Sequence, residues 1–306
     1  MARLRLGTRG SALARLQSAL VAKKLTALGV PVEIVTIVTA GDVRAPDTPW
    51  GEGAFVGALE GALRARTIDL AVHSAKDVPV EPQTDLVIAA YPIRADPRDA
   101  LVTPIAATLD GLHTGAVVGT DSPRRTGFLR AARPDLRVVP LHGNVDTRLK
   151  RLDAGEVDAL VLAVAGLERL GLAGRIAAIL APAVVPPAPG QGALAVQVRR
   201  ADHSLRRMLA DIDSPQVRVA VTIEREVLHA RGGGCRAPLG ALAVANDGIV
   251  RLLAAVVSPD GSQRIAFERE ARSAGAMRMA RDVGRRLRPA STPTLGPGVP
   301  VLHGLA

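Results

Sequence analysis

Residues 68–79 read IDLAVHSAKDVP, an apolar run of strand type that ends abruptly in a polar cluster. The run from Ile68 to Val72 is typical of a buried strand in a parallel sheet. Ligands of open α/β sheets bind at the carboxyl ends of the strands. The segment therefore predicts a fold class and a site at its end, although a solvated charge pair in a loop is the alternative reading of Lys76 and Asp77.

The segments around this run alternate between strand and helix signals. Residues 4–6 predict a short strand, and the turn at residues 7–11 opens a helix in which Leu13, Leu16 and Leu20 form one apolar stripe. Residues 32–38 predict a second strand, and Phe55, Leu59 and Leu63 mark a second helix. This order predicts a parallel sheet with helices on its faces.

A second copy of the same layout follows in the chain. Residues 116–122 (AVVGTDS) echo residues 4–11 (LRLGTRGS), and residues 156–161 (EVDALV) echo residues 67–72 (TIDLAV). We therefore expect two similar α/β domains that face each other across a cleft, with both Gly-Thr turns at the cleft. The helix N-termini there would present N–H groups and a positive dipole end to an anion.

The last third of the chain has a different character. Residues 182–192 are rich in Pro and Gly and predict a crossing between domains. A helix around Val217 is followed by three strand-like runs, with turns at residues 246–248 and 259–261, and by a last helix with Met277, Ala280 and Leu287. This pattern predicts a small α+β domain with a three-stranded antiparallel sheet.

Composition fits a globular protein of two or three domains, since 48% of the 306 residues are hydrophobic and 22% are charged. No apolar run is long enough to span a bilayer, and arginines interrupt the N-terminus, so we expect a cytoplasmic protein without a membrane partner. A net charge of +10 could indicate nucleic acid, a small polyanionic ligand or only an Arg-rich composition. Aromatic residues make up 2% of the chain, which argues against base stacking on single-stranded nucleic acid.

Basic residues recur at predicted turns and helix starts. Ser122 precedes Arg124 and Arg125, and Arg148 follows the turn of residues 142–144. The planar fork of arginine suits carboxylates. A solvated basic face is the alternative for any one of these residues.

The chain has one cysteine, Cys235, directly after three glycines. A single cysteine makes no intramolecular disulfide. It is either a small buried apolar residue or a reactive thiol that a glycine-rich loop presents at a cleft. The sequence around it leaves both readings open.

Taken together, nine segments resemble the porphobilinogen deaminase (hydroxymethylbilane synthase) family, in order along nearly the whole chain. They are TRGS (8–11), GD (41–42), HSAKDVP (73–79), DPRDA (96–100), GT (119–120) with RR (124–125), GNV (143–145) with TRL (147–149), LAVAGL (162–167), GQG (190–192) and GGC (233–235).

The resemblance implies two α/β domains like those of type II periplasmic binding proteins, flanking a cleft, and a third, α+β domain that carries the cofactor loop. The expected domains are residues 1–92 with 193–212, residues 93–192, and residues 213–306. Family members are monomeric enzymes of haem and porphyrin biosynthesis. They hold a dipyrromethane cofactor in thioether linkage to the loop cysteine, here Cys235, condense four porphobilinogen units onto it, and release hydroxymethylbilane by hydrolysis.

The resemblance also implies roles for particular residues. Asp77 would stabilise charge on the pyrrole nitrogens and shuttle protons. Basic side chains would bind the acetate and propionate groups of each pyrrole, other residues would add hydrogen bonds, and Phe55 could stack on a ring. The basic residues are Arg9, Lys76, Arg124, Arg125 and Arg148; the hydrogen-bonding residues are Ser11, Thr120, Ser122 and Asn144. The matching motifs add His73, Ser74, His142 and Gln191 to the binding set.

Three positions depart from the family pattern and make the expected cleft less positive. Glu52 replaces a usual Lys, His142 replaces an Arg, and Asp121 replaces a Ser. A carboxylate that faces a substrate carboxylate weakens binding. Either neighbouring arginines compensate, or the chain is a paralogue that acts on another pyrrole or makes a shorter product. A non-catalytic cleft protein that binds a small anion is the third alternative, but binding alone requires neither Cys235 nor Asp77.

Overall fold

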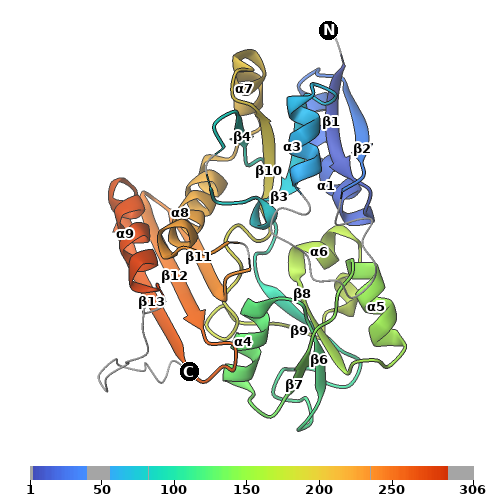
Figure 1. Cartoon of the computed structure of the whole chain (residues 1–306), viewed down its shortest axis with the longest axis vertical. Coiled ribbons are helices and arrows are strands. Elements are labelled where there is room, and N and C mark those ends of the chain that lie inside the picture. The colour runs from blue at the N-terminus through green and yellow to red at the C-terminus, as the bar shows by residue number, and fades with distance from the viewer. Residues whose placement is uncertain (1–2, 40–55, 82, 235, 289–306) are drawn as a thin grey trace.

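Three β-sheets organise the described part of the chain, as the computed structural model in Figure 1 shows. The structure describes residues 3–39, 56–81, 83–234 and 236–288. The first sheet lies at the upper right of the view, the second below it and the third at the left. No helix within these residues has the length and apolar character needed to cross a membrane.

The first sheet is mixed, with the strand order β2-β1-β3-β10-β4. Its strands are β1 (Leu4–Arg9), β2 (Val32–Ile37), β3 (Leu70–Ser74), β4 (Leu86–Ala90) and β10 (Leu194–Arg199). Strands β2, β1 and β3 are parallel, whereas β10 pairs antiparallel with both β3 and β4. Its helices are α1 (Ala12–Ala27), α3 (Gly57–Arg64) and α7 (His203–Ala210).

The second sheet repeats this arrangement with the order β7-β6-β8-β5-β9. Its strands are β5 (Asp99–Val102), β6 (Val117–Gly119), β7 (Arg137–Val139), β8 (Ala159–Ala163) and β9 (Ala178–Ile179). Again three strands are parallel and the fourth, β5, is antiparallel. Its helices are α4 (Pro123–Ala132), α5 (Val145–Asp153) and α6 (Val164–Arg169). The chain also has two short 3-10 turns: η1 (Ala75–Asp77) follows β3 of the first sheet, and η2 (Ala173–Arg175) follows α6.

The shared order confirms the expected pair of α/β domains, and the strands predicted in residues 4–72 pair in parallel, but each sheet also contains an antiparallel strand that the sequence pattern did not predict. Strand β10 comes back from the second sheet and enters the first one from the opposite direction. Strand β5 does the same in the second sheet, on the outward crossing. Each sheet is thus completed by a strand next to a crossing, which local periodicity does not reveal.

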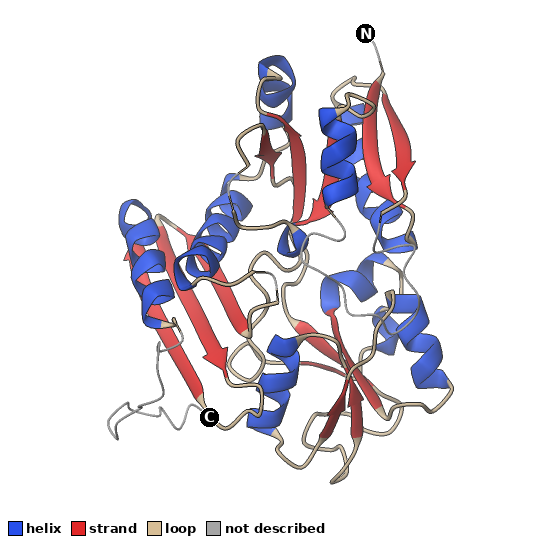
Figure 2. Ribbon diagram, in the orientation of Figure 1, coloured by secondary structure: helices blue, strands red, loops and turns tan. Residues whose placement is uncertain are grey.

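The third sheet is the expected antiparallel one, β11 (Leu239–Asn246), β12 (Ile249–Val257) and β13 (Arg264–Arg272). Asp247 and Gly248 both have positive φ, as the tight hairpin turn between β11 and β12 requires. Helices α8 (Pro215–Arg231) and α9 (Ser273–Arg286) pack on this sheet through a core that includes Val227, Leu252 and Val283 (Figure 2). The fold class is confirmed, and the expected domain boundaries stay a prediction.

The apolar stripe expected on α1 is wrong. Leu16 and Leu20 are 42% and 36% exposed, and the buried face carries Gln17 and Ser18 with Val21 and Leu25. The helix therefore turns polar side chains toward its own sheet. One of them, Gln17, lines the cavity described below.

A buried carboxylate ties both crossings to the third sheet. Glu224 of α8 accepts from both terminal nitrogens of Arg94 at 2.9 and 3.1 Å, from Gly190 N at 2.7 Å and from Ala243 N at 2.8 Å. Arg94 lies on the outward crossing and Gly190 on the return crossing. Burial raises the pKa of Glu224 against the opposing effect of Arg94.

Glycines allow the third sheet to approach the second one closely. A Cβ atom at Gly261 would lie 2.5 Å from Ala131 N, and one at Gly127 would lie 2.8 Å from the Ser258 carbonyl oxygen. Both contacts join α4 to the loop after β12. This loop and α4 therefore meet backbone to backbone.

Candidate functional site

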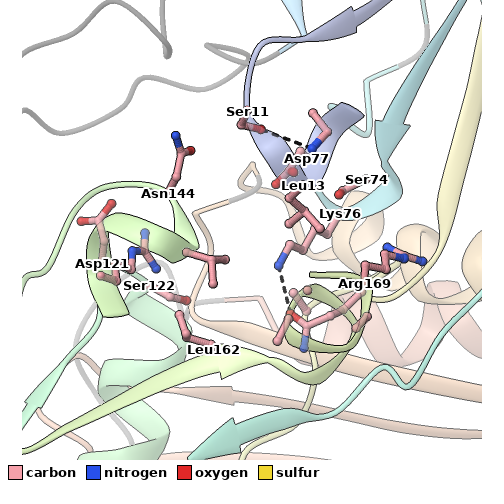
Figure 3. A pocket seen from close by; sticks show the side chains of 18 of the residues that line it. Ser11, Leu13, Ser74, Lys76, Asp77, Asp121, Ser122, Asn144, Leu162 and Arg169 are labelled. Atoms are coloured by element: carbon pink, nitrogen blue, oxygen red, sulfur yellow. Dashed lines mark hydrogen bonds between the residues drawn. The ribbon is translucent and has the colours of Figure 1, made fainter. Parts of the chain in front are cut away.

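A cavity of about 320 Å³ opens between the first and second sheets, and Figure 3 shows its lining. Elements from both sheets contribute to it: β1, α1 and η1 from the first, α4, α5 and α6 from the second. The predicted site residues that line it are Arg9, Ser11, Ser74, Lys76, Asp77, Ser122, Arg124, Arg125, Asn144, Arg148 and Gln191. The structure thus brings together residues that lie up to 182 positions apart, from Arg9 to Gln191.

Helix N-termini point into this cavity from both sides. Ser11 is the N-cap of α1 and accepts from Ala14 N at 3.3 Å, and Ser122 is the N-cap of α4 and accepts from Arg125 N at 3.4 Å. Asn144 is the N-cap of α5, and its side chain makes no capping bond. The positive ends of three helix dipoles therefore face one cavity, which favours an anionic ligand.

Lys76 and Asp77 lie in η1, directly after the carboxyl end of β3. Lys76 Nζ donates to Gln191 Oε1 at 3.3 Å. Burial lowers the pKa of Lys76 to about 8, although the charge of Asp77 opposes this shift. Burial thus disfavours the protonated form of Lys76, and Asp77 compensates only in part. An anionic ligand in the cavity would stabilise the protonated form further.

Arg124 and Arg125 are held from behind by Asp99, the first residue of β5. Arg124 Nη1 donates to Asp99 Oδ2 at 2.7 Å, and Arg125 Nη2 donates to Asp99 Oδ1 at 2.7 Å. Burial alone would raise the pKa of Asp99, but the two arginines lower it well below its usual range. Two cations share one carboxylate, so this buried cluster keeps a net positive charge beside the cavity.

Arg148 of α5 has a nitrogen without a partner. Its Nε is sealed from solvent and makes no hydrogen bond within the described residues. Burial and the neighbouring charge of Arg125 lower the pKa of Arg148 to about 10, against the attraction of Asp121. A buried, unsatisfied guanidinium nitrogen in a cavity wall suits a carboxylate ligand.

Three predicted binding residues do not line the cavity. His73 is 5% exposed, and its Nε2 lies 3.0 Å from Gln197 Oε1 inside the first sheet's core. Burial lowers the pKa of His73 to about 4, so the ring is neutral at pH 7. Thr120 is buried under the cavity wall and accepts from Ser122 N at 3.3 Å, and His142 lies behind Asp121.

The two described departures from the family pattern face each other. His142 Nδ1 lies 3.0 Å from Asp121 Oδ2, without the alignment of a hydrogen bond, and Arg236 Nη1 lies 3.7 Å from the same oxygen. Asp121 lines the cavity. The guanidinium group of Arg236 therefore offsets part of the negative charge that Asp121 brings to an anion site.

Sequence reasoning missed four polar residues of the wall, Gln17, Asp146, Arg169 and Arg236. Gln17 Nε2 donates to Ser74 Oγ at 3.1 Å and so fixes the end of β3 against α1. Arg169 ends α6, donates to the Gly192 carbonyl at 2.6 Å, and has a pKa lowered by burial. The adjacent polar residues Gln17 and Ser18 within the apolar helix α1 were a sequence signal that could have identified Gln17. Arg169 is one of many arginines, and no sequence signal distinguishes it.

Cys235, Phe55 and Glu52 lie outside the described residues. The neighbours of Cys235 do border the site: Arg236 lines the main cavity, and Gly234 lines a second cavity of about 40 Å³ that also touches Lys76 and Ser122. The chain on both sides of the thiol therefore reaches the wall of the site.

Comparison with known proteins gives consistent matches. The family model described as "Porphobilinogen deaminase, dipyromethane cofactor binding domain" matches residues 4–207, and the model of the porphobilinogen deaminase C-terminal domain matches residues 219–290. The porphobilinogen deaminase of Acidothermus cellulolyticus is 50% identical over 292 residues, which covers 93% of this chain and 87% of the relative. That of Thermobifida fusca is 50% identical over 270 residues, covering 86% and 84%.

Among solved structures, a periplasmic substrate-binding protein of an ABC transporter from Coxiella burnetii is similar with a TM-score of 0.45 and 18% identity, covering 70% of this chain and 93% of that one. The two family models together span both α/β domains and the third sheet. The chain belongs to the porphobilinogen deaminase family.

Proposed function

We propose that this chain is a transferase that condenses four porphobilinogen units head to tail on a dipyrromethane primer held by Cys235. Ammonia leaves at each condensation, and hydrolysis releases the linear tetrapyrrole hydroxymethylbilane. The observation that carries the proposal is the cavity in which Asp77 shares a wall with Lys76, Arg124, Arg125 and Arg148. The lining carries seven basic side chains against the three carboxylates of Asp77, Asp121 and Asp146, and a poly-carboxylated pyrrole chain matches this excess of cations.

The residues present fit a dipyrromethane. Each of its rings carries an acetate and a propionate group, and the buried Nε of Arg148 has no other partner among the described residues. Lys76 and Ser122 border both cavities, and the second cavity leads to Gly234, next to Cys235. When bound, the dipyrromethane supplies the free α-carbon to which the first porphobilinogen unit is added.

Asp77 is the residue proposed to act on the reacting ring. Its carboxylate lines the cavity at the carboxyl end of β3, where it can accept hydrogen bonds from pyrrole N–H groups. Loss of ammonia and attack by the α-carbon both place positive charge on a pyrrole nitrogen. A carboxylate fixed beside that nitrogen stabilises the charge and can accept and return a proton.

The surrounding residues bind and orient the substrate carboxylates. Arg124 and Arg125 are anchored by Asp99, so their guanidinium planes are set before a ligand arrives. Arg9 and Arg148 line the cavity from the first and the second sheet respectively, and Ser11 and Asn144 add hydrogen-bonding groups at helix starts. Groups fixed in advance lose little entropy on binding and hold reacting atoms at short range.

The same proposal includes the organisation of the molecule. Residues 1–92 with 193–212, residues 93–192 and residues 213–306 would form the three domains, which the strand membership of each sheet supports. We propose that the protein works as a monomer in the cytoplasm, where a reducing environment keeps the Cys235 thiol available for its thioether bond.

A paralogue with a less acidic substrate is the alternative that Asp121 and His142 suggested. The contact of Asp121 with Arg236 favours the first proposal, since the guanidinium group offsets part of the charge of the added carboxylate. The cavity keeps its excess of basic groups. A strongly anionic ligand is therefore still the better match.

Incubation of the purified protein with porphobilinogen tests the proposal. We expect ammonia release together with a linear tetrapyrrole in the product mixture. The intact mass of the wild-type protein should exceed the sequence mass by one dipyrromethane, whereas Cys235→Ser should show the sequence mass. Absence of ammonia release, or an unmodified wild-type mass, would contradict the proposed reaction or its covalent anchor.

A further inference from the structure

We infer that Asp99 is a positioning residue that aims three cations of the cavity at the substrate carboxylates: Arg124 and Arg125 directly, and Lys76 through Gln191. The inference rests on the proposed function and deepens it. Asp99 itself does not line the cavity. It is fully buried at the start of β5, so it acts on the ligand only through these neighbours.

The contacts of Asp99 use both of its oxygens. Oδ2 accepts from Arg124 Nη1 at 2.7 Å, and Oδ1 accepts from Arg125 Nη2 at 2.7 Å and Nε at 3.2 Å. Oδ1 also accepts from Gln191 Nε2 at 2.8 Å. Arg124 is fixed further by the Pro186 carbonyl at 2.6 Å. Both arginines are consecutive residues of the first turn of α4, and a single carboxylate sets the orientation of the pair.

The branch through Gln191 reaches the other sheet. Because Gln191 Nε2 donates to Asp99 and to the Pro97 carbonyl at 2.7 Å, its Oε1 is left to accept from Lys76 Nζ at 3.3 Å. Gln191 lies on the return crossing and Lys76 in η1 of the first sheet. The chain Asp99–Gln191–Lys76 therefore spans the junction between the two sheets and fixes the ammonium group beside Asp77.

Physical reasons make this arrangement effective for binding an anion. Two buried guanidinium groups without a counter-charge would be strongly unfavourable, and one carboxylate stabilises both while leaving donors free for a ligand. The charged hydrogen bonds also restrict rotamers, so less conformational entropy is lost when the substrate binds. An amide in place of the carboxylate would keep the shape of the residue but remove the charge and one acceptor.

Lys76 gives the inference a readout that a purely structural role would not change. The charged groups that act on Lys76 are Asp77, Arg125, Asp99 and Arg124, and Asp99 is one of the two that favour its protonated form. Asp99→Asn should therefore lower the pKa of Lys76 further. The alkaline limb of kcat/KM for porphobilinogen would then move to lower pH.

The experiment compares the wild-type holoenzyme with Asp99→Asn, Arg125→Gln and the double variant, with cofactor loading checked by intact mass. We expect Asp99→Asn to lower kcat/KM by roughly 10- to 100-fold, as misplaced positioning groups do, and to shift the alkaline limb downward. The effect of Asp99→Asn should shrink in the Arg125→Gln background. If Asp99→Asn alone does not fold, kcat/KM and the alkaline limb are compared between Arg125→Gln and the double variant. The double variant buries one cation fewer than Asp99→Asn, and a further downward shift of the alkaline limb in it would support the inference.

Asp213→Asn is the matched control. Asp213 also holds an arginine, accepting from Arg218 Nε at 2.6 Å, and it lines neither cavity. The Asp213→Asn substitution should lower the stability of the protein and leave KM and the alkaline limb unchanged. Wild-type kcat/KM and pH profile in Asp99→Asn, or fully independent effects of the two substitutions, would overturn the inference. A wild-type protein that releases no ammonia would instead contradict the proposed function.

Discussion

Lys76 and Asp77 are consecutive residues of one 3-10 turn, and both line the same cavity (Figure 3). The turn follows the carboxyl end of β3, so the sheet delivers a cation and a carboxylate to one place. Gln191 fixes the cation, and the carboxylate is left at the cavity wall. One short segment thus provides the two kinds of group that the proposed reaction needs, one for substrate carboxylates and one for pyrrole nitrogens.

Replacing Asp77 tests the proposed action on the reacting ring. We expect Asp77→Asn and Asp77→Ala to fold normally but to lower kcat by roughly 100-fold or more, the usual contribution of a positioned acid–base group. Single-turnover assays and circular dichroism give the two readouts. Near-normal turnover in either variant would refute the assignment.

The pKa of Lys76 predicts a pH dependence of substrate capture. Below pH 8 the amine is protonated and binds carboxylates, and above pH 8 it becomes neutral, so kcat/KM should fall as the pH rises through about 8. Lys76→Arg keeps its charge in this range and should remove that limb. Measurement of kcat/KM from pH 7 to 9.5 checks the difference; identical alkaline limbs would show that another group titrates.

The unsatisfied Nε of Arg148 predicts a binding role. Arg148→Gln should raise KM roughly tenfold or more, since hydrogen bonds to charged groups contribute about 1.5–3 kcal/mol. Arg130→Gln, on the far part of α4 where Arg130 contacts the Pro259 carbonyl, is a suitable control and should leave KM unchanged. Equal KM values for Arg148→Gln and the wild type would remove Arg148 from the site.

Restoring the family residues at two of the departing positions should tighten binding. We expect Glu52→Lys with His142→Arg to lower KM about two- to fivefold, which corresponds to an added charge attraction of about 1 kcal/mol or less. His142→Arg alone reports on the side chain behind Asp121, and Glu52 lies outside the described residues. Isothermal titration with porphobilinogen on the Asp77→Ala background measures binding without turnover. Unchanged affinity would mean that neither position affects the cavity.

His73 predicts a change of stability with pH rather than of binding. Its pKa is about 4 in the folded protein and ordinarily 6.5, so between these values the unfolded chain binds a proton that the folded one does not. This contribution to stability is therefore lost as the pH falls from 6.5 to 4. The difference in unfolding free energy between wild type and His73→Gln should shrink over that range, as measured by urea titration. A constant difference would contradict a buried neutral ring.

The sequence predicted the parts of this molecule that depend on local signals. The serine starts of α1 and α4, the hairpin at Asp247-Gly248 and the polar end of β3 all follow from short patterns, and the structure confirms them. Eleven of the predicted site residues line one cavity. They could be predicted because each belongs to a short motif that matches the family pattern, in the same order along the chain.

Features that depend on distant partners were not accessible in this way. Leu16 and Leu20 have helical spacing, yet α1 buries Val21 and Leu25 in the core of the first sheet, and the same face carries Gln17, which bonds to Ser74, 57 residues away. The antiparallel placement of β10 depends on the crossing from the second sheet. Asp99 belongs to a matching motif, but only the fold shows that two arginines and Gln191 converge on it.

The bare-backbone contacts at Gly127 and Gly261 have a consequence for the anchored thiol. At Gly127 and Gly261 the backbones of α4 and of the loop after β12 lie so close that an added Cβ atom at either position would force the two elements apart. Helix α8, whose end begins the stretch toward Cys235, packs on the same sheet as that loop. Helix α8 and the arginine pair at the start of α4 are thus joined through the third sheet, and widening of the contact at Gly127 or Gly261 would change the distance between them.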